Sequence, residues 1–264
     1  MTEEEPRATF SDPQARGGVI GGKGYGFQAA YIVSRIPLWL GDPDFAAFIQ
    51  EGAGDADVLF RRPGGEERWY IQVKNYQVTP AVAREVFDQF RETDQGSEGT
   101  FTRFTLACRG LSQQLKSIRD AISDWRGLAP MYRPGQDTIL DNTWQDLEKK
   151  VDTLKLERAD AQFLVDKVHF DTDLSGLTSD ASLRRLFVGS LLELDAWAAV
   201  KPAAARRAYE KLARLCHQEE GIRRTYTRQD VEAVIREAAG DAPPPPKVAQ
   251  ALVLWGKLPF PLAD

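Results

Sequence analysis

The chain has 264 residues, of which 28% are charged and 42% hydrophobic, and its formal net charge is -5. A chain of this size and composition folds around a hydrophobic core of its own, so it needs no disulfide staples. Its two cysteines, Cys108 and Cys216, lie far apart, and only His169 and His217 accompany them. This spacing excludes a structural zinc site of Cys and His ligands, and we expect a reduced, cytoplasmic protein.

The first residues, MTEEEPRATF, are acidic and contain no apolar core of signal-peptide length. No apolar run approaches the roughly 18 residues that a membrane-spanning helix needs, so we expect no membrane association. The mildly acidic total argues against a protein that coats nucleic acid through bulk charge. One local exception is the window 184–228, which holds ten Lys or Arg residues against five acids.

The first half of the chain predicts a helix followed by strands. Apolar residues at helical spacing predict a helix between Gly24 and Gly41, bent or ended near Pro37. Three strands are expected over 45–52, 57–62 and 68–76, and PGGEE between the last two is typical of a hairpin turn. These three strands predict an antiparallel meander. A helix over 79–93 and a strand over 101–110 follow.

The chain after Leu111 is mostly helical by its apolar spacing, so the expected fold class is α+β with a helical C-terminal half. Four prolines at 243–246 favour an extended segment that separates an apolar tail. The predicted organisation is a polar tail over 1–16, a core over 17–130, a helical extension with a basic surface over 131–242, and a Pro-rich linker with the tail over 243–264. The apolar tail suggests that this chain is the N-terminal part of a longer protein.

Polar residues alternate along the predicted strand 68–76. Because successive strand residues face opposite sides, Gln72 and Lys74 project together. The segment GDADV places Asp55 and Asp57 at the start of the neighbouring strand. Hairpin pairing then brings an acid, an amide and an ammonium group together.

Such a group suits phosphodiester hydrolysis with a divalent cation, which oxygen ligands hold and which activates the attacking water. In this interpretation Asp57 anchors the metal, and Lys74 orients or deprotonates the water. Turn residues and half-exposed strands also carry such side chains for purely structural reasons, and that alternative stays open for Asp57, Gln72 and Lys74.

The order GYGFQ, GDADV and QVKNY, with a helix on either side, resembles the PD-(D/E)XK nuclease superfamily in the variant with Gln in place of the acid. Within it, the pattern over about 17–115 is similar to Mrr-type restriction endonucleases and to the double-strand DNA endonuclease domain of CD-NTase-associated (CBASS) anti-phage effectors. The resemblance implies a restriction-endonuclease-like core and a Mg²⁺ site, with Mn²⁺ as a substitute. It implies Asp57 and Gln72 at the metal, Lys74 as the catalytic lysine and Gln28 near the site.

Two further acids accompany this set. Asp55 is a supporting residue. Gln28 stands where Mrr-like enzymes often have Glu, and Glu51 is the alternative metal ligand if Gln28 does not complete the site. DNA contacts are expected from basic residues of the Gly-rich segment and of one helix face, namely Lys23, Arg206, Arg207, Lys211 and Arg214. Solvated helix faces are the structural alternative for the last four.

The segment GGVIGGKG matches the first part of a phosphate-binding loop through Gly17, Gly22 and Lys23, but Gly24 stands where the motif needs Ser or Thr. We therefore expect a flexible approach to the first helix.

The sequence thus predicts a Mg²⁺-dependent, largely sequence-non-specific double-strand DNA endonuclease that serves as an effector in anti-phage defence. We expect a homo-oligomer that works with a sensor domain or an NTPase partner. The alternatives are a catalytically silent module of nuclease fold that binds DNA or a partner protein, and a nucleotide-binding protein that uses GGVIGGKG.

Overall fold

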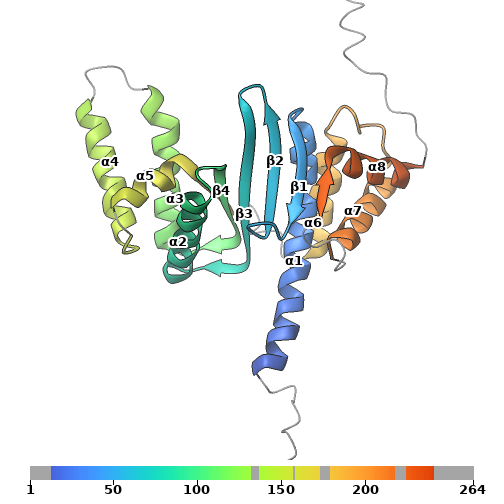
Figure 1. The fold of residues 1–264 in the computed structure, drawn as a ribbon, viewed down its shortest axis with the longest axis horizontal. Coiled ribbons are helices and arrows are strands. Elements are labelled where there is room, and N and C mark those ends of the chain that lie inside the picture. Colours follow the sequence, from blue (N-terminus) through green and yellow to red (C-terminus); the bar gives the residue numbers. More distant parts are fainter. Residues whose placement is uncertain (1–12, 132–136, 157, 173–178, 218–223, 241–264) are drawn as a thin grey trace, which may run out of the picture.

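The computed structural model describes residues 13–131, 137–156, 158–172, 179–217 and 224–240, of which 13–25, 137, 158 and 159 are described by their backbone alone. A six-stranded sheet in the order β5-β4-β3-β2-β1-β6 runs through the middle of the molecule. Helices gather at its two ends, α2 to α5 at one and α1 with α6 to α8 at the other (Figure 1). The described part of the chain is therefore a mixed α/β structure built on one sheet.

The antiparallel meander predicted from the sequence is confirmed. It consists of β1 (Phe45–Gln50), β2 (Ala56–Arg62) and β3 (Gly65–Val78). In β2 and β3, Asp57 pairs with Tyr70 and Val58 with Trp69. This register places Ala56 opposite Ile71, so the start of β2 lies beside the stretch of β3 that carries Gln72.

The long strand β3 also pairs in parallel with β4 (Phe101–Leu111), and α2 (Pro80–Gly96) makes the crossover. Pro80 fits the first helical turn because its missing N–H has no partner there in any case. Helical spacing then buries Ala83, Val86, Phe87 and Phe90 against the sheet. The expected helix over 79–93 and the expected strand over 101–110 are thus both confirmed.

Beyond β4, the chain builds the α2 end of the molecule. This part comprises α3 (Gln113–Leu128), a short 3₁₀ turn η1 (Ala129–Met131), α4 (Asp137–Asp152), α5 (Arg158–Lys167) and β5 (Val168–Asp171). The strand β5 pairs in parallel with β4 and forms one edge of the sheet. Apolar residues of α2 to α5 share one buried cluster with the Tyr70 and Phe104 face of the sheet.

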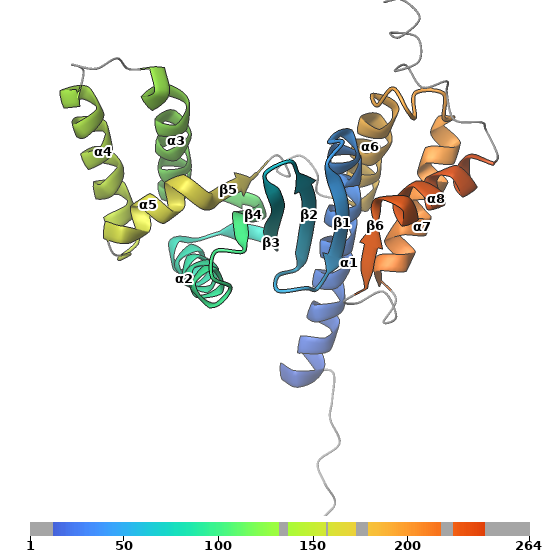
Figure 2. The same ribbon diagram turned by 45° about the horizontal axis from the view of Figure 1, so that its top comes forward.

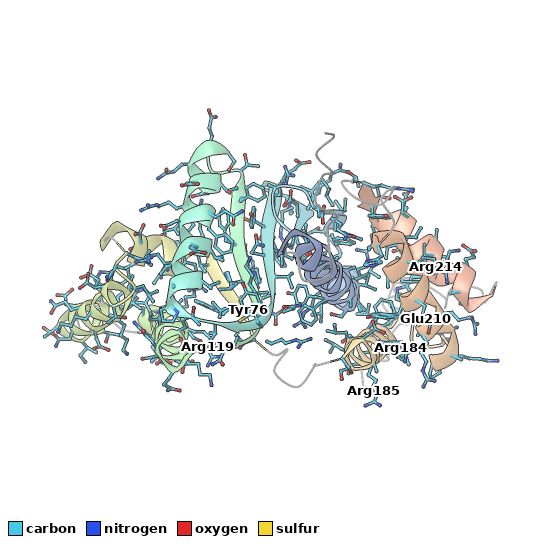
Figure 3. All side chains as sticks on the ribbon, turned by 90° about the horizontal axis from the view of Figure 1, so that it is seen from below. Tyr76, Arg119, Arg184, Arg185, Glu210 and Arg214 are labelled. Atoms are coloured by element: carbon cyan, nitrogen blue, oxygen red, sulfur yellow. The ribbon has the colours of Figure 1, made fainter. Side chains whose placement is uncertain are left out.

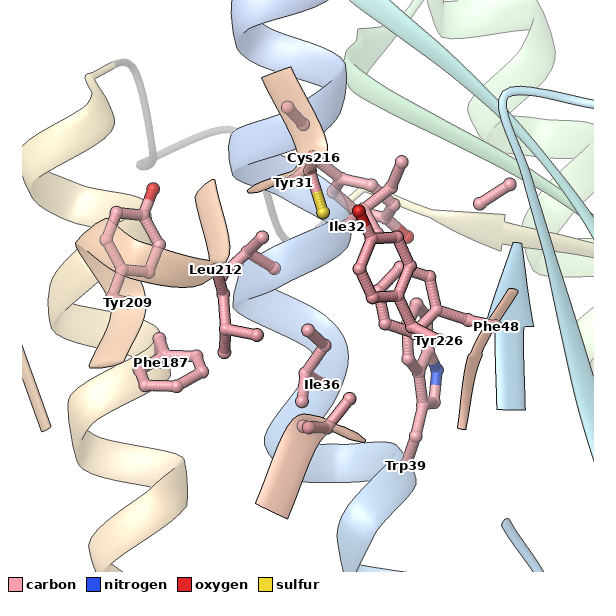
Figure 4. Close-up of a cluster of buried hydrophobic side chains, with 14 of the residues drawn as sticks. Tyr31, Ile32, Ile36, Trp39, Phe48, Phe187, Tyr209, Leu212, Cys216 and Tyr226 are labelled. Carbon is pink, nitrogen blue, oxygen red and sulfur yellow. The ribbon is translucent and has the colours of Figure 1, made fainter. Parts of the chain in front are cut away.

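The opposite face packs on α1 (Pro13–Gly41), and the remaining elements complete that side. They are α6 (Asp180–Leu192), α7 (Pro202–His217), β6 (Thr225–Thr227) and α8 (Arg228–Ala239). Figure 4 shows the buried contact, in which Ile32 and Ile36 of α1 meet Phe187 and Leu212 on one side and Phe48 of β1 on the other. The short β6 pairs with β1 and forms the second edge of the sheet, as Figure 2 shows.

Two sequence expectations are corrected by this arrangement. The first helix continues through Pro37 to Gly41 and includes the Gly-rich segment GGVIGGKG, which was expected to be a flexible approach. The helical half contains two short strands, β5 and β6, whose three or four residues are too few for a periodic signal. The described elements of the expected extension over 131–242 divide between the two buried clusters.

Within the described residues, none of the helices combines the length and the hydropathy that crossing a bilayer requires. The polar tail over 1–12 and the Pro-rich segment with the apolar tail over 241–264 lie outside the described residues.

Candidate functional site

The carboxylate of Asp55 lies at the junction of α1, β2 and β3. Its Oδ1 accepts a hydrogen bond from Gln28 Nε2 at 3.0 Å, and its Oδ2 accepts from Gln72 Nε2 at 2.7 Å and from the Val73 backbone N–H at 2.6 Å. Three donors from two elements therefore converge on one acid. The expected grouping of an acid with Gln72 is present, and Asp55 is its centre.

Asp57 occupies a different position. Its buried carboxylate accepts from Arg68 Nη2 at 2.7 Å and from the backbone N–H groups of Ala53 and Gly54 at 3.0 and 3.3 Å. The sequence predicts Asp57 as the metal anchor and Asp55 as a supporting residue, whereas in the structure Asp57 accepts hydrogen bonds from the turn before β2 and Asp55 contacts Gln72. Arg68, the partner of Asp57, was not singled out from the sequence.

The turn between β1 and β2 sets where Asp55 lies. Glu51 begins it with φ of 50°, a left-handed backbone that L residues rarely adopt, and its N–H donates to the Asp55 carbonyl at 2.9 Å. A side chain at Gly54 would bring its Cβ within 2.8 Å of the Ile71 carbonyl oxygen, and one at Gly52 would meet the Asp57 carboxylate. Glycine at both positions lets the turn close onto Asp57.

Burial raises the pKa of the Asp55 carboxyl above its ordinary value. The Val73 N–H and the Lys74 ammonium lower this pKa in part, while the nearby Glu51 carboxylate raises it further. Burial, with Asp55 and Asp57 close by, also raises the pKa of the Tyr70 hydroxyl to about 12. Burial is thus the main effect on the Asp55 carboxyl, and a positive group beside it stabilises its charged form.

The side chains at this junction fit a hard cation in part. Carboxylate and amide oxygens are the ligands that Mg²⁺ prefers. Asp55 and Glu51 supply carboxylates, and the amide oxygens of Gln28 and Gln72 have no hydrogen-bond partner among the described residues. Within the described ranges, however, no group of three or more His, Cys, Asp or Glu side chains lies close enough together to hold a metal ion.

The basic residues expected to contact DNA lie partly in ion pairs. On α7, Lys211 pairs with Glu237, and Arg207 donates to the Ala238 carbonyl at 2.8 Å. Arg206 and Arg214 are exposed. Figure 3 shows Arg214 on the same side of the molecule as Arg184 and Glu210, which pair at 3.0 Å. The side chain of Lys23 lies outside the described residues.

No protein-family model matches this sequence. The chain is 27% identical over 187 residues to CD-NTase-associated protein 4 of Moraxella osloensis, and 23% identical over 165 residues to the protein of that name from an Acinetobacter species. These stretches cover 70% and 62% of this chain but only 39% and 36% of the relatives. The chain therefore spans well under half the length of the curated relatives that it matches.

Solved structures agree with the sequence matches. The Moraxella osloensis Cap4 SAVED/CARF-domain containing receptor superposes with a TM-score of 0.66 at 21% identity, over 83% of this chain and 48% of that one. The Acinetobacter baumannii Cap4 receptor with the cyclic trinucleotide 2′3′3′-cAAA gives a TM-score of 0.65 at 16% identity, over 80% of this chain and 44% of that one. This chain is thus similar in sequence to CD-NTase-associated protein 4 and in fold to the Cap4 receptors. At these identities the superpositions establish a shared fold.

The names of these proteins correct the expected function. The two solved structures are named as receptors, one of them with a bound cyclic trinucleotide, and none of these names describes a nuclease. The expectation of a Mg²⁺-dependent double-strand DNA endonuclease is therefore contradicted by this comparison. Binding of double-stranded DNA likewise finds no support in these names, whereas the expected CBASS relationship does.

We expect Asp57→Ala to lower the free energy of unfolding by about 2–4 kcal/mol, because it leaves Arg68 and two turn N–H groups without their acceptor. Urea unfolding followed by circular dichroism measures the change. Glu66→Ala, which removes an exposed carboxylate 3.6 Å from Arg61, is the control and should cost less than about 1 kcal/mol. Equal stability of the two variants would contradict the anchoring role.

The raised pKa of Asp55 gives a second expectation. A carboxyl whose pKa is raised on folding contributes stability at pH below its unfolded pKa, and this contribution is lost as pH rises through the folded pKa. The wild type should therefore lose stability relative to Asp55→Asn as pH rises from the ordinary Asp pKa toward neutrality, in urea unfolding at a series of pH values.

Asp42→Asn is the matched control for this pH series. Burial is the largest single effect on the pKa of Asp42 and raises it, but the Asp44 N–H and the Arg62 guanidinium together outweigh burial, so the pKa is lowered. The difference in stability between the wild type and Asp42→Asn should therefore grow only as pH rises up to the ordinary Asp pKa, and should stay level from there toward neutrality. If the two differences in stability changed with pH in the same way, burial would not be raising the pKa of Asp55.

Proposed function

We propose that this chain acts in antiviral defence as a module of a receptor that responds to a cyclic oligonucleotide. The observation that carries the proposal is the fold shared with Cap4 receptors over 80–83% of the chain, at TM-scores of 0.65–0.66. The sequence match to CD-NTase-associated protein 4 over 187 residues supports it independently. A receptor of this class converts binding of a small cyclic nucleotide signal into a change of state in the protein that contains it.

We also infer that the junction around Asp55 binds a divalent cation, with Asp55 and Glu51 as carboxylate ligands and Gln28 and Gln72 as sources of amide oxygens. The raised pKa of Asp55 supports this inference, because a bound cation would offset the charge that burial penalises. Mg²⁺ is the expected ion, and Mn²⁺ accepts the same oxygen ligands. Lys74 supplies part of the compensating positive charge in the ion's absence.

The resemblance to PD-(D/E)XK proteins is retained as a proposal about fold alone. It is supported by the order of helix, three antiparallel strands, crossover helix and parallel strand, and by the meeting of Asp55 with Gln72. We attach no activity to it, because fold does not determine function.

The receptor proposal predicts binding of the cyclic trinucleotides 2′3′3′-cAAA or 3′3′3′-cAAA, measured by isothermal titration calorimetry. Both this chain and the complete product of its gene should be titrated, with linear ApApA as the control. Binding by the chain would place the sensor within it, and binding by the complete product alone would make the chain a module of that receptor. Binding by neither protein would refute the proposal.

The cation proposal predicts that Mg²⁺ or Mn²⁺ raises the melting temperature of the chain and that Asp55→Asn abolishes the increase. The physical reason is that the substitution removes the central carboxylate and its charge. Differential scanning calorimetry with and without EDTA measures the shift. Glu66→Gln should leave it unchanged, and an increase of the same size in Asp55→Asn would locate the ion elsewhere.

A further inference from the structure

A cavity of about 370 Å³ lies where α1 meets β3, β4 and β5. Its lining combines aromatic and charged side chains, among them Arg35, Leu38, Trp69, Arg103 and Asp171. Leu38 is 55% exposed, so part of the lining is open to solvent. The residues of the Asp55 junction are not among those that line this cavity.

The charged side chains that line the cavity are two arginines and two aspartates. Arg35 pairs with Asp171 at 2.6 Å, and Asp42 is one of three carboxylates that share Arg62. Arg103, in contrast, forms no salt bridge with any described residue. Among the described residues, it is the charged side chain of the lining that has no ion-pair partner.

The guanidinium of Arg103 is held in place by stacking. It lies over the Trp69 ring at 4.4 Å from the centroid, and Phe60 packs against the same indole at 4.4 Å between centroids. Its Nε donates to Thr105 Oγ1 at 3.3 Å. Among the described residues, Nη1 and Nη2 have no hydrogen-bond partner, so the end of the guanidinium that makes bidentate contacts is available.

Burial disfavours the charge of the Arg103 guanidinium. Burial lowers the pKa of Arg103, although Tyr31, Asp171 and Glu67 oppose the effect. Burial, together with Arg103 and Arg126, lowers the pKa of His169 to about 3. His169 therefore stays neutral and adds no charge, while Arg126 directs its guanidinium to the backbone carbonyls of Leu164, Val165 and Val168. A bound anion would compensate Arg103 directly.

We propose that this cavity binds a nucleoside phosphate, with the phosphate on the Nη groups of Arg103. A planar guanidinium with two free N–H edges matches a phosphate, and its stacked plane is a surface on which nucleobases pack. The volume is near the lower end of the roughly 300–1,000 Å³ of small-molecule pockets, which suits one nucleotide. The nucleotide is either free or one unit of a cyclic oligonucleotide, and only the second source rests on the receptor function proposed above.

The test is calorimetric titration of this chain with AMP, with 3′3′3′-cAAA and with inorganic phosphate. We expect Arg103→Ala to weaken binding of AMP or of the cyclic trinucleotide by at least about tenfold, because a charge-assisted bidentate contact is lost. Arg103→Lys keeps the charge but not the fork, so its affinity should lie between those of the wild type and the Ala variant. Arg61→Ala, at a guanidinium that is 73% exposed, is the control and should bind as the wild type does.

A second variant guards against a folding defect at Arg103. Leu38→Trp places a larger side chain at an exposed position of the lining and should reduce binding while the melting temperature stays unchanged. Loss of binding in both Arg103→Ala and Leu38→Trp supports the proposal. Unchanged affinity in Arg103→Ala, or no binding of either AMP or the trinucleotide by the wild type, overturns it.

The three probes separate this inference from the receptor function. If the trinucleotide binds equally well to the wild type and to Arg103→Ala, the receptor function stands and the cavity is not its site. If AMP binds through Arg103 but the trinucleotide binds neither this chain nor the complete gene product, the cavity proposal stands and the receptor function fails. If inorganic phosphate binds but AMP and the trinucleotide do not, the cavity is a simple anion site and the proposal that it binds a nucleoside phosphate is overturned.

Discussion

The double pairing of β3 is the constraint on which the rest of the structure depends. This strand of 14 residues pairs antiparallel with β2 on one side and parallel with β4 on the other. Because side chains alternate across it, Ile71 and Val73 enter the core under α1 while Tyr70 enters the core under α2. A shift of one residue in its register would exchange these two sets and would separate Gln72 from Asp55. The strand therefore fixes both cores and the Asp55 junction at once.

The sequence predicts most of the meander, the crossover helix and β4, because periodicity and turn residues are local signals that the sheet reinforces. It does not predict β5 or β6, because these strands exist only through pairing with β4 and β1, partners that are distant in the chain. The same distinction applies to the junction. Alternation alone places Gln72 and Lys74 together, but which of Asp55 and Asp57 meets them depends on how the turn at Gly52 and Gly54 folds back. Arg68 pairs with Asp57, so Asp55 is the acid that contacts Gln72, and the spacing of the two acids in the sequence does not reveal this pairing.

The relation to Cap4 proteins also shows what a motif can establish. Short motifs in the order GYGFQ, GDADV and QVKNY pointed to the CD-NTase-associated proteins to which the chain is similar, but also to an effector activity that the names of these proteins do not support. An acid, an amide and an ammonium at one sheet junction are compatible with ion binding, with signal binding and with simple structural support. All three interpretations depend on the buried carboxylate of Asp55, because burial raises its pKa.

The two edges of the sheet have a consequence for synthesis of the chain. The core strands β1 to β4 are complete once residue 111 is made, but the strands that cover their free edges are β5, at 168–171, and β6, at 225–227. During translation the nascent sheet therefore presents unpaired backbone groups along β4 until β5 arrives, and along β1 until nearly the whole described chain has left the ribosome. Open edges of this kind pair readily with other chains. The interval between β4 and β6 is thus when this protein most needs protection from aggregation.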